Sequence, residues 1–185
     1  LNESNMPAPY SSWGPTANRT MKPDICAKGY VIHGSRVYMG TSFSAPRVSA
    51  AAAEVIEFCR AHKIPWSPGT VKAALMAGAT PLAFPEYIVG AGALNVSAAL
   101  DIIQRTGGEE QMPEITYVHP TGIPLDFERL FYGDTYEFGI EIINSWAAAY
   151  EIRVNASAPD VFMIEPTANV NQTGYIPLSI HIPNN

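Results

Sequence analysis

The stretch GTSFSAPRV, residues 40–48, opens the longest helical pattern in the sequence. Strong helix formers follow it to about His62, in the run SFSAPRVSAAAAEVIEFCRAH, and Pro46 interrupts them only near the start, where a missing amide costs little. Apolar and small residues recur there with helical spacing, at Ala45, Val48, Ala52, Val55, Ile56 and Cys59. We therefore predict a helix from Ser42 to about His62 whose buried face consists mostly of small side chains.

Ser42 stands where a helix start favours nucleophilic chemistry. A serine nucleophile needs a base within hydrogen-bond reach and donors for the oxyanion that forms. In the first turn of a helix, the backbone N–H of the serine points outward and supplies one such donor. Gly40 permits a sharp turn and the close approach of a substrate, and Thr41 can cap the helix. The triplet alone predicts either a nucleophile for acyl transfer or an ordinary helix cap.

Two more helices are predicted from their caps. Ser67 and Pro68 form a good start for a helix that ends near Gly78. Asn95 begins another, which runs to the glycine pair at 107–108. Upstream of Ser42, glycines separate two short strands that we expect around residues 24–27 and 30–32.

Beyond residue 114 the hydrophobic period changes to two, which is typical of strands. The alternating segments are residues 136–145, 150–158, 161–166 and 175–183. Short strands at this spacing favour an antiparallel β-sandwich, but the sequence holds five or six where such a fold takes about seven. We therefore expect an α/β portion at 1–106, a linker at 107–114 and an incomplete sandwich-like domain at 115–185.

The charge of −6 is unevenly distributed. Residues 1–106 carry six acidic and nine basic side chains, and residues 107–185 carry eleven acidic and two basic ones. This change of sign supports two segments of different character, and the lack of a basic stripe argues against nucleic acid as a partner. The sequence has no apolar run of 18 residues, so we expect no membrane span. Cys26 and Cys59 are expected to be buried thiols rather than a disulfide framework.

Five segments together resemble the subtilisin-like serine proteases, or subtilases. GTSFSAPRVSAAAA is similar to the Gly-Thr-Ser motif that opens a long buried helix in that family. In the same order as in the family, YSSWGP at 10–15 resembles Phe-Ser-Ser-x-Gly-Pro, and KPDICAKG at 22–29 resembles Lys-Pro-Asp-Ile-x-Ala-Pro-Gly. WSPGTVKAALMAGA at 66–79 and GAGALNVSAAL at 90–100 resemble the next helix and the last glycine-rich segment with its helix.

The resemblance implies a specific chemistry. Ser42 would be the catalytic nucleophile and its backbone N–H an oxyanion donor, with Gly40, Thr41 and Pro46 supporting the motif. The fold would be the C-terminal portion of a doubly wound α/β domain, and the reaction peptide-bond hydrolysis through an acyl-enzyme. The family also implies secretion and a protein or peptide substrate. Many subtilases bind calcium, but no metal site or cofactor site is visible in this sequence, and Glu109 and Glu110 are expected to be solvated.

The sequence also departs from the family pattern. The family triad runs Asp, His, Ser along the chain, yet upstream of Ser42 neither Glu3 nor Asp24 lies in an Asp-Ser/Thr-Gly segment. Asp24 matches the structural Lys-Pro-Asp position, and His33 lacks the second histidine of His-Gly-Thr-His. We therefore expect the catalytic Asp and His to come from the remainder of the catalytic domain, outside this chain, which alone would be inactive. Arg47 stands where the family often has histidine.

Three functions are compatible with these residues. The first is a fragment of a secreted subtilisin-like serine endopeptidase. The second is a non-catalytic scaffold for binding or assembly, in which Ser42 is only a helix cap and the acidic β-region makes the contacts. The third is an exopeptidase of the same family that releases tripeptides. Upstream Asp-Ser/Thr-Gly and His-Gly-Thr-His segments in the full gene would favour the first or third over the second.

Overall fold

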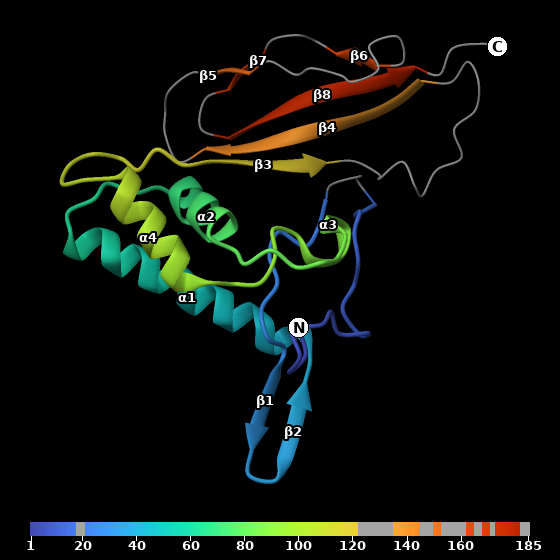
Figure 1. Ribbon diagram of the computed structural model, residues 1–185, viewed down its shortest axis with the longest axis vertical. Helices are drawn as coiled ribbons and strands as arrows, with labels where there is room; N and C mark the ends of the chain where they lie inside the picture. Colours follow the sequence, from blue (N-terminus) through green and yellow to red (C-terminus); the bar gives the residue numbers. More distant parts are fainter. Residues whose placement is uncertain are drawn as a thin grey trace.

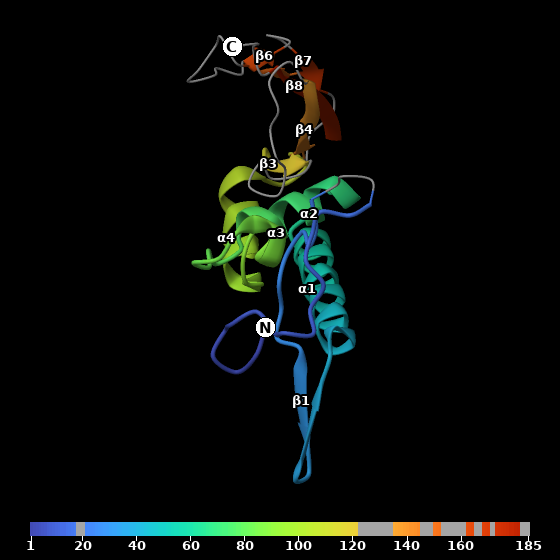
Figure 2. The ribbon, with the colours of Figure 1, turned by 90° about the vertical axis from the view of Figure 1, so that its right-hand side faces the viewer.

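The computed structural model describes residues 1–17, 21–121, 135–144, 150–152, 162–164, 168–170 and 173–181. In Figures 1 and 2 these residues form a projecting hairpin at one end, a layer of helices in the middle and an antiparallel sheet at the other end. The mixture of helices and small sheets agrees with the α/β class predicted from the sequence. The large parallel sheet of a complete doubly wound domain is not seen among these residues.

The predicted helices are confirmed, and capping side chains set the starts of two of them. They are α1 (Thr41–Ala61), α2 (Pro68–Ala77) and α4 (Val96–Thr106), and a short α3 (Glu86–Val89) joins them. In the capping box of α2 the Thr70 amide donates to Ser67 Oγ over 3.1 Å, and the Ser67 amide donates to Thr70 Oγ1 over 3.0 Å. The Asn95 side chain accepts from the Ala98 amide over 3.1 Å, so each of these helices begins where the sequence predicts.

The hairpin before α1 differs from the sequence prediction. It pairs β1 (Tyr30–His33) with β2 (Arg36–Met39) across a two-residue turn in which Gly34 has φ +61°. A positive φ is strained for other residues, so this glycine permits the tight turn. The predicted strand at 24–27 is wrong, because only Cys26 forms a bridge there, to Ala93.

The core lies among the helices. From α1 it takes Ala51, Val55 and Cys59, all at most 2% exposed, and it continues into α2 and α4 through small and branched side chains. Ile115 and Ile143 belong to the same cluster, although they follow the helices in the chain. The sheet therefore packs on the helical layer, with α2 lying between α1 and the strands (Figure 1).

The strands after residue 114 are antiparallel throughout the described part. They are β3 (Thr116–Thr121), β4 (Thr135–Asn144), β5 (Tyr150–Ile152), β6 (Phe162–Ile164), β7 (Ala168–Val170) and β8 (Thr173–His181). The order β3-β4-β8-β6 gives a four-stranded sheet, and β5 pairs with β7. The four predicted strands all have a counterpart, while β3 and β7 were not predicted. A complete sandwich stays a prediction, as do the domain boundaries.

The segment 107–114, predicted to be a linker, follows the helical layer closely. Pro113 is fully buried, and the Thr70 hydroxyl donates to Met112 Sδ over 3.5 Å. Glu109 pairs with Lys63 at 2.6 Å on the exposed surface. The contact of Met112 with Thr70 holds this segment against the N-terminal half of α2.

Candidate active site

Ser42 is exposed at the second position of α1. Gly40 is the N-cap residue and has an extended backbone, so neither Ser42 nor Thr41 caps the helix, and the interpretation of these side chains as caps is wrong. Within the part of the chain that the structure describes, the Ser42 hydroxyl has no hydrogen-bond partner. A hydroxyl left free at a helix start is available for chemistry.

The backbone around Ser42 also leaves a donor free. The Gly40 carbonyl accepts from the Phe43 amide over 3.1 Å, whereas the Ser42 amide finds no acceptor among the described residues. The first amides of a helix lack intrahelical partners and lie at the positive end of its dipole. The Ser42 N–H therefore has the position that an oxyanion donor needs.

Pro46 lies inside α1, in its second turn, because the helix begins at Thr41. Four residues separate Pro46 from Ser42, and proline has no N–H to donate to the Ser42 carbonyl. Pro46 is exposed, so its ring covers little of the core. The first turns of α1 are thus held by one intrahelical bond fewer than usual.

The segment before the hairpin lies against the start of α1. The Ser44 hydroxyl donates to the Ala27 carbonyl over 3.1 Å, and the Gly40 amide donates to the Gly29 carbonyl over 2.8 Å. A Cβ on Gly29 would lie 2.8 Å from Ser44 Oγ and 2.9 Å from the Gly40 carbonyl oxygen, so only glycine fits. No local sequence pattern marks Ser44 or Gly29 as neighbours, because their contact joins residues distant in the chain.

Neither histidine of the N-terminal half provides a base for Ser42. His33 lies at the turn of the hairpin, opposite Arg36, three residues or about 10 Å of strand from the end of β2 at Met39. His62 follows the other end of α1, about 30 Å from Ser42 along the helix. His119 lies on β3.

The nearest acidic side chain upstream of the motif is also engaged elsewhere. The Asp24 carboxylate forms ion pairs with Lys22 and with Lys72 of α2, the latter at 3.4 Å. A carboxylate held by two lysines has a structural role, as the resemblance implied. Among the described residues, the start of α1 therefore presents the Ser42 hydroxyl and a free Ser42 amide, while His33, His62 and Asp24 lie or are engaged elsewhere.

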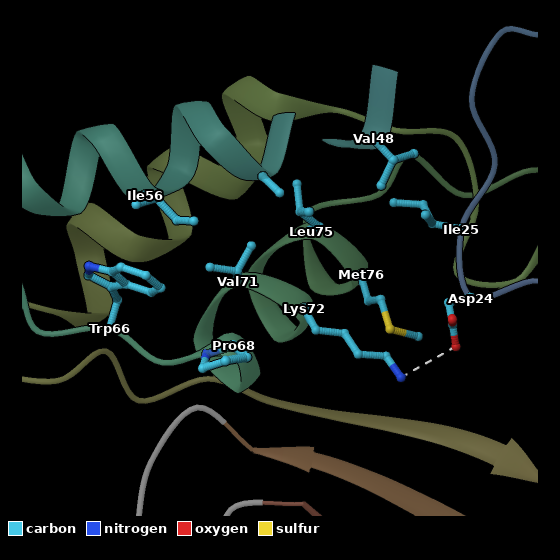
Figure 3. Close-up of a pocket in the computed structure, with 11 residues that line it drawn as sticks. Asp24, Ile25, Val48, Ile56, Trp66, Pro68, Val71, Lys72, Leu75 and Met76 are labelled. Atoms are coloured by element: carbon cyan, nitrogen blue, oxygen red, sulfur yellow. Dashed lines mark ion pairs between the residues drawn. The ribbon is translucent and has the colours of Figure 1, made fainter. Parts of the chain in front are cut away.

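An apolar groove of about 410 Å³ runs between α1 and α2 (Figure 3). Val48, Ala52 and Ile56 line it from α1, and Val71, Leu75 and Met76 line it from α2. Figure 3 shows these side chains pointing toward one another, with Trp66 at one end and the Lys72–Asp24 ion pair at the other. The small-residue helix thus has an open apolar side in the part of the chain that the structure describes.

The two cysteines are free thiols. Cys59 is fully buried in α1 and Cys26 is half-buried, and burial raises the pKa of both thiols. A raised pKa leaves little thiolate at neutral pH, so neither thiol competes with Ser42 as a nucleophile.

Among the described residues, histidine, cysteine and acidic side chains nowhere gather in groups of three that could hold a metal ion. The sequence also favours a surface loop over a calcium site at Asp126, Glu128 and Asp134, and these three residues lie outside the described residues.

In the part of the chain that the structure describes, each helix is too short or too polar to cross a bilayer.

Comparison with known proteins defines the class. Residues 1–100 match the subtilase family, peptidase S8. Pyrolysin of Pyrococcus furiosus is 30% identical over 115 residues, an alignment that covers 54% of this chain and 8% of pyrolysin. The crystal structure of tripeptidyl peptidase 2 aligns with a TM-score of 0.47 and 21% identity, over 76% of this chain and 13% of that one. The chain spans a small part of the length of both relatives.

The chain belongs to the subtilase family, because the family match covers more than half of its residues. This confirms the resemblance found in the sequence, and membership of the family supports a serine-peptidase type of function. The matched range includes the Gly-Thr-Ser triplet and helices α1 and α2.

Proposed function

We propose that this chain is the serine-bearing part of a subtilisin-like serine endopeptidase, with Ser42 as the nucleophile. The observation that carries the proposal is the state of Ser42 at the start of α1. Its hydroxyl is exposed and has no partner among the described residues, and its amide donates to none of them. In a subtilase Gly-Thr-Ser motif this arrangement matches the chemistry of acyl transfer.

The proposed reaction assigns each step to an atom. Ser42 Oγ attacks the scissile carbonyl and gives its proton to a histidine from the remainder of the catalytic domain. The oxyanion accepts a hydrogen bond from the Ser42 N–H, and the C–N bond then breaks as the histidine returns the proton to the leaving amine. Water hydrolyses the acyl-enzyme in the same manner. We assign no metal or cofactor to these steps.

The remainder of the catalytic domain is the partner that this proposal requires. The apolar groove between α1 and α2 supports it, since a hollow of about 410 Å³ lined by aliphatic side chains is a surface that burial would stabilise. If the rest of the domain covers this groove, it lies beside α1. It can then place its histidine next to Ser42 at the start of that helix. Peptide or protein substrates and secretion are proposed from family membership.

The test is peptide hydrolysis by the full-length gene product and by the 185-residue chain, each with a Ser42→Ala variant. We expect turnover by the full-length protein, its loss by at least about a thousandfold in Ser42→Ala, and no turnover by the 185-residue chain. Ser49→Ala is the matched control, because the Ser49 hydroxyl, also on α1, only donates to the Ala45 carbonyl over 3.2 Å.

Two results would contradict the proposal. Turnover by the 185-residue chain that Ser42→Ala abolishes would mean that the base lies within the chain. A folded full-length protein without turnover would favour the non-catalytic scaffold. Mass analysis of the products separates the remaining alternative, because internal cuts identify an endopeptidase and successive tripeptides identify an exopeptidase.

A further inference from the structure

The start of α1 lacks the usual stabilising features of a helix N-terminus. Gly40 makes no side-chain capping bond, the first turn has no acidic residue, and Pro46 removes one intrahelical bond. Arg47 adds a positive charge near the positive end of the dipole, which is unfavourable. Such a start would fray unless other contacts hold it. Ser42 lies within this weakly capped stretch.

The contacts that hold it converge on one short stretch of backbone, which we call the carbonyl row: the carbonyl oxygens of Ala27, Gly29 and Tyr30. Ser44 Oγ donates to the first over 3.1 Å, and the Gly40 amide donates to the second over 2.8 Å. Two further donors complete the row and come from side chains that the function proposed above does not use.

These two donors are the side chains of Tyr10 and Arg47. The Tyr10 hydroxyl donates to the Gly29 carbonyl over 3.0 Å, and the Arg47 guanidinium donates to the Tyr30 carbonyl over 3.0 Å. In the family pattern that the sequence resembles, phenylalanine stands at the position of Tyr10, and histidine often stands at the position of Arg47. A phenylalanine has no hydroxyl to donate, so the bond from Tyr10 is a feature of this chain.

The two donors tie the carbonyl row to the chain just before and just after Ser42. Tyr10 binds the same Gly29 oxygen that accepts from Gly40, two residues before the serine. Arg47 reaches back from the second turn of α1 to the residue that follows Gly29. Because Gly29 has no room even for a Cβ, a shift in the carbonyl row is transmitted directly to Gly40 and Ser44.

We propose that Tyr10 and Arg47 are positioning residues for Ser42, which fix the start of α1 through the carbonyl row. The inference rests on the proposed function and adds two residues to it. Among the described residues the Ser42 side chain has no hydrogen bond to orient it, so its placement depends on the backbone from Gly40 to Ser44. A nucleophile displaced by about 1 Å from its attack geometry loses up to about a hundredfold in rate, while substrate binding elsewhere is unaffected.

The experiment compares Tyr10→Phe and Arg47→Met with the wild type in the full-length gene product. We expect kcat to fall about five- to tenfold in each variant with KM within twofold, and the rate of Ser42 labelling by a fluorophosphonate to fall by the same factor. Arg47→Lys should recover part of the loss, because an ammonium group can still donate to the Tyr30 carbonyl.

The matched controls remove the same groups at a distance from Ser42. Tyr117→Phe deletes a hydroxyl on β3, and Arg105→Met deletes a guanidinium that donates to the Asp101 carbonyl of α4 over 3.2 Å. Both controls should retain wild-type kcat and labelling rate. All rates are measured at a temperature at which circular dichroism shows every variant to be fully folded, so that a loss of rate does not report unfolding.

The outcomes separate this inference from the proposed function. Wild-type labelling at Ser42 with unchanged rates in Tyr10→Phe and Arg47→Met would overturn the inference and leave the function standing. Equal losses in the variants and their controls, or a loss confined to KM, would also overturn it. Absence of labelling in the folded wild-type protein would overturn both.

Discussion

At the scale of single residues, two serines of one motif have opposite roles. Ser44 donates to the Ala27 carbonyl and is structural, whereas the hydroxyl of Ser42 is exposed and unbonded among the described residues. Two residues are about 200° apart around a helix, so the two side chains point to opposite sides of α1. Sequence identifies Ser42 through the Gly-Thr-Ser motif, but it does not reveal that Ser44 ties the helix to the preceding segment.

The same scale gives a prediction for pH. Burial, and then the nearby charge of Glu86, raise the pKa of the Tyr117 hydroxyl above its usual value. The folded state therefore holds this proton more tightly than the unfolded state. The resulting stability is fully present below about pH 10 and is lost as the pH rises through the raised pKa.

Tyr117→Phe should therefore reduce the loss of stability above pH 10. Urea unfolding of wild type and variant at pH 8 and at pH 11 measures this loss. Between pH 8 and pH 11, the urea midpoint of the variant should fall less than that of the wild type. An equal fall in both proteins would show that Tyr117 is not the group responsible.

At the scale of elements, the helices follow from local sequence and the strand pairs do not. Ser67 and Asn95 cap α2 and α4 as predicted, because a capping side chain bonds an amide only three residues away. The pairing of β4 with β8 joins segments about 40 residues apart, and no local pattern specifies such a partner. The sequence predicted strand β1 of the hairpin but not β2. All four residues of β2 are exposed, so no alternation of buried and exposed side chains marks it as a strand.

The cap of α4 gives a prediction at this scale. Asn95 Oδ1 accepts from the Ala98 amide over 3.1 Å, while its Nδ2 donates to Thr80 Oγ1 over 3.1 Å. Asn95→Ala removes both bonds and should lower the free energy of unfolding by about 1 kcal/mol. Asn95→Asp keeps the acceptor and should lose less, as measured by urea unfolding. Equal losses in the two variants would show that the cap contributes nothing.

At the scale of the whole molecule, the sheet and the helices share one core. Ile143 of β4 is 1% exposed and belongs to the same cluster as Ala74 and Leu75 of α2. Ile115, just before β3, joins it as well. The change of hydrophobic period at residue 115 led us to predict a separate unit. Periodicity indicates the type of element but not which elements pack together, so it did not reveal this shared core.

This shared core predicts that the two parts unfold together. Ile143→Ala should lower the free energy of unfolding by about 2–5 kcal/mol, since it leaves a cavity between β4 and α2. Circular dichroism and tryptophan fluorescence, to which Trp66 beside α2 contributes, should report one transition at the same midpoint. Ile32→Ala, at a site that is 61% exposed on the hairpin, is the control and should change little. Separate transitions for sheet and helices would contradict the shared core.

Ser42 is the proposed nucleophile of a serine peptidase whose base we propose to come from the rest of its catalytic domain. The most direct measurement is labelling of the full-length gene product and of the 185-residue chain with a fluorophosphonate, followed by peptide mapping, with Ser42→Ala as the control. The account predicts label on Ser42 in the full-length protein only, and none in the variant. Label on another residue, or an unlabelled Ser42 in the folded full-length protein, would contradict it.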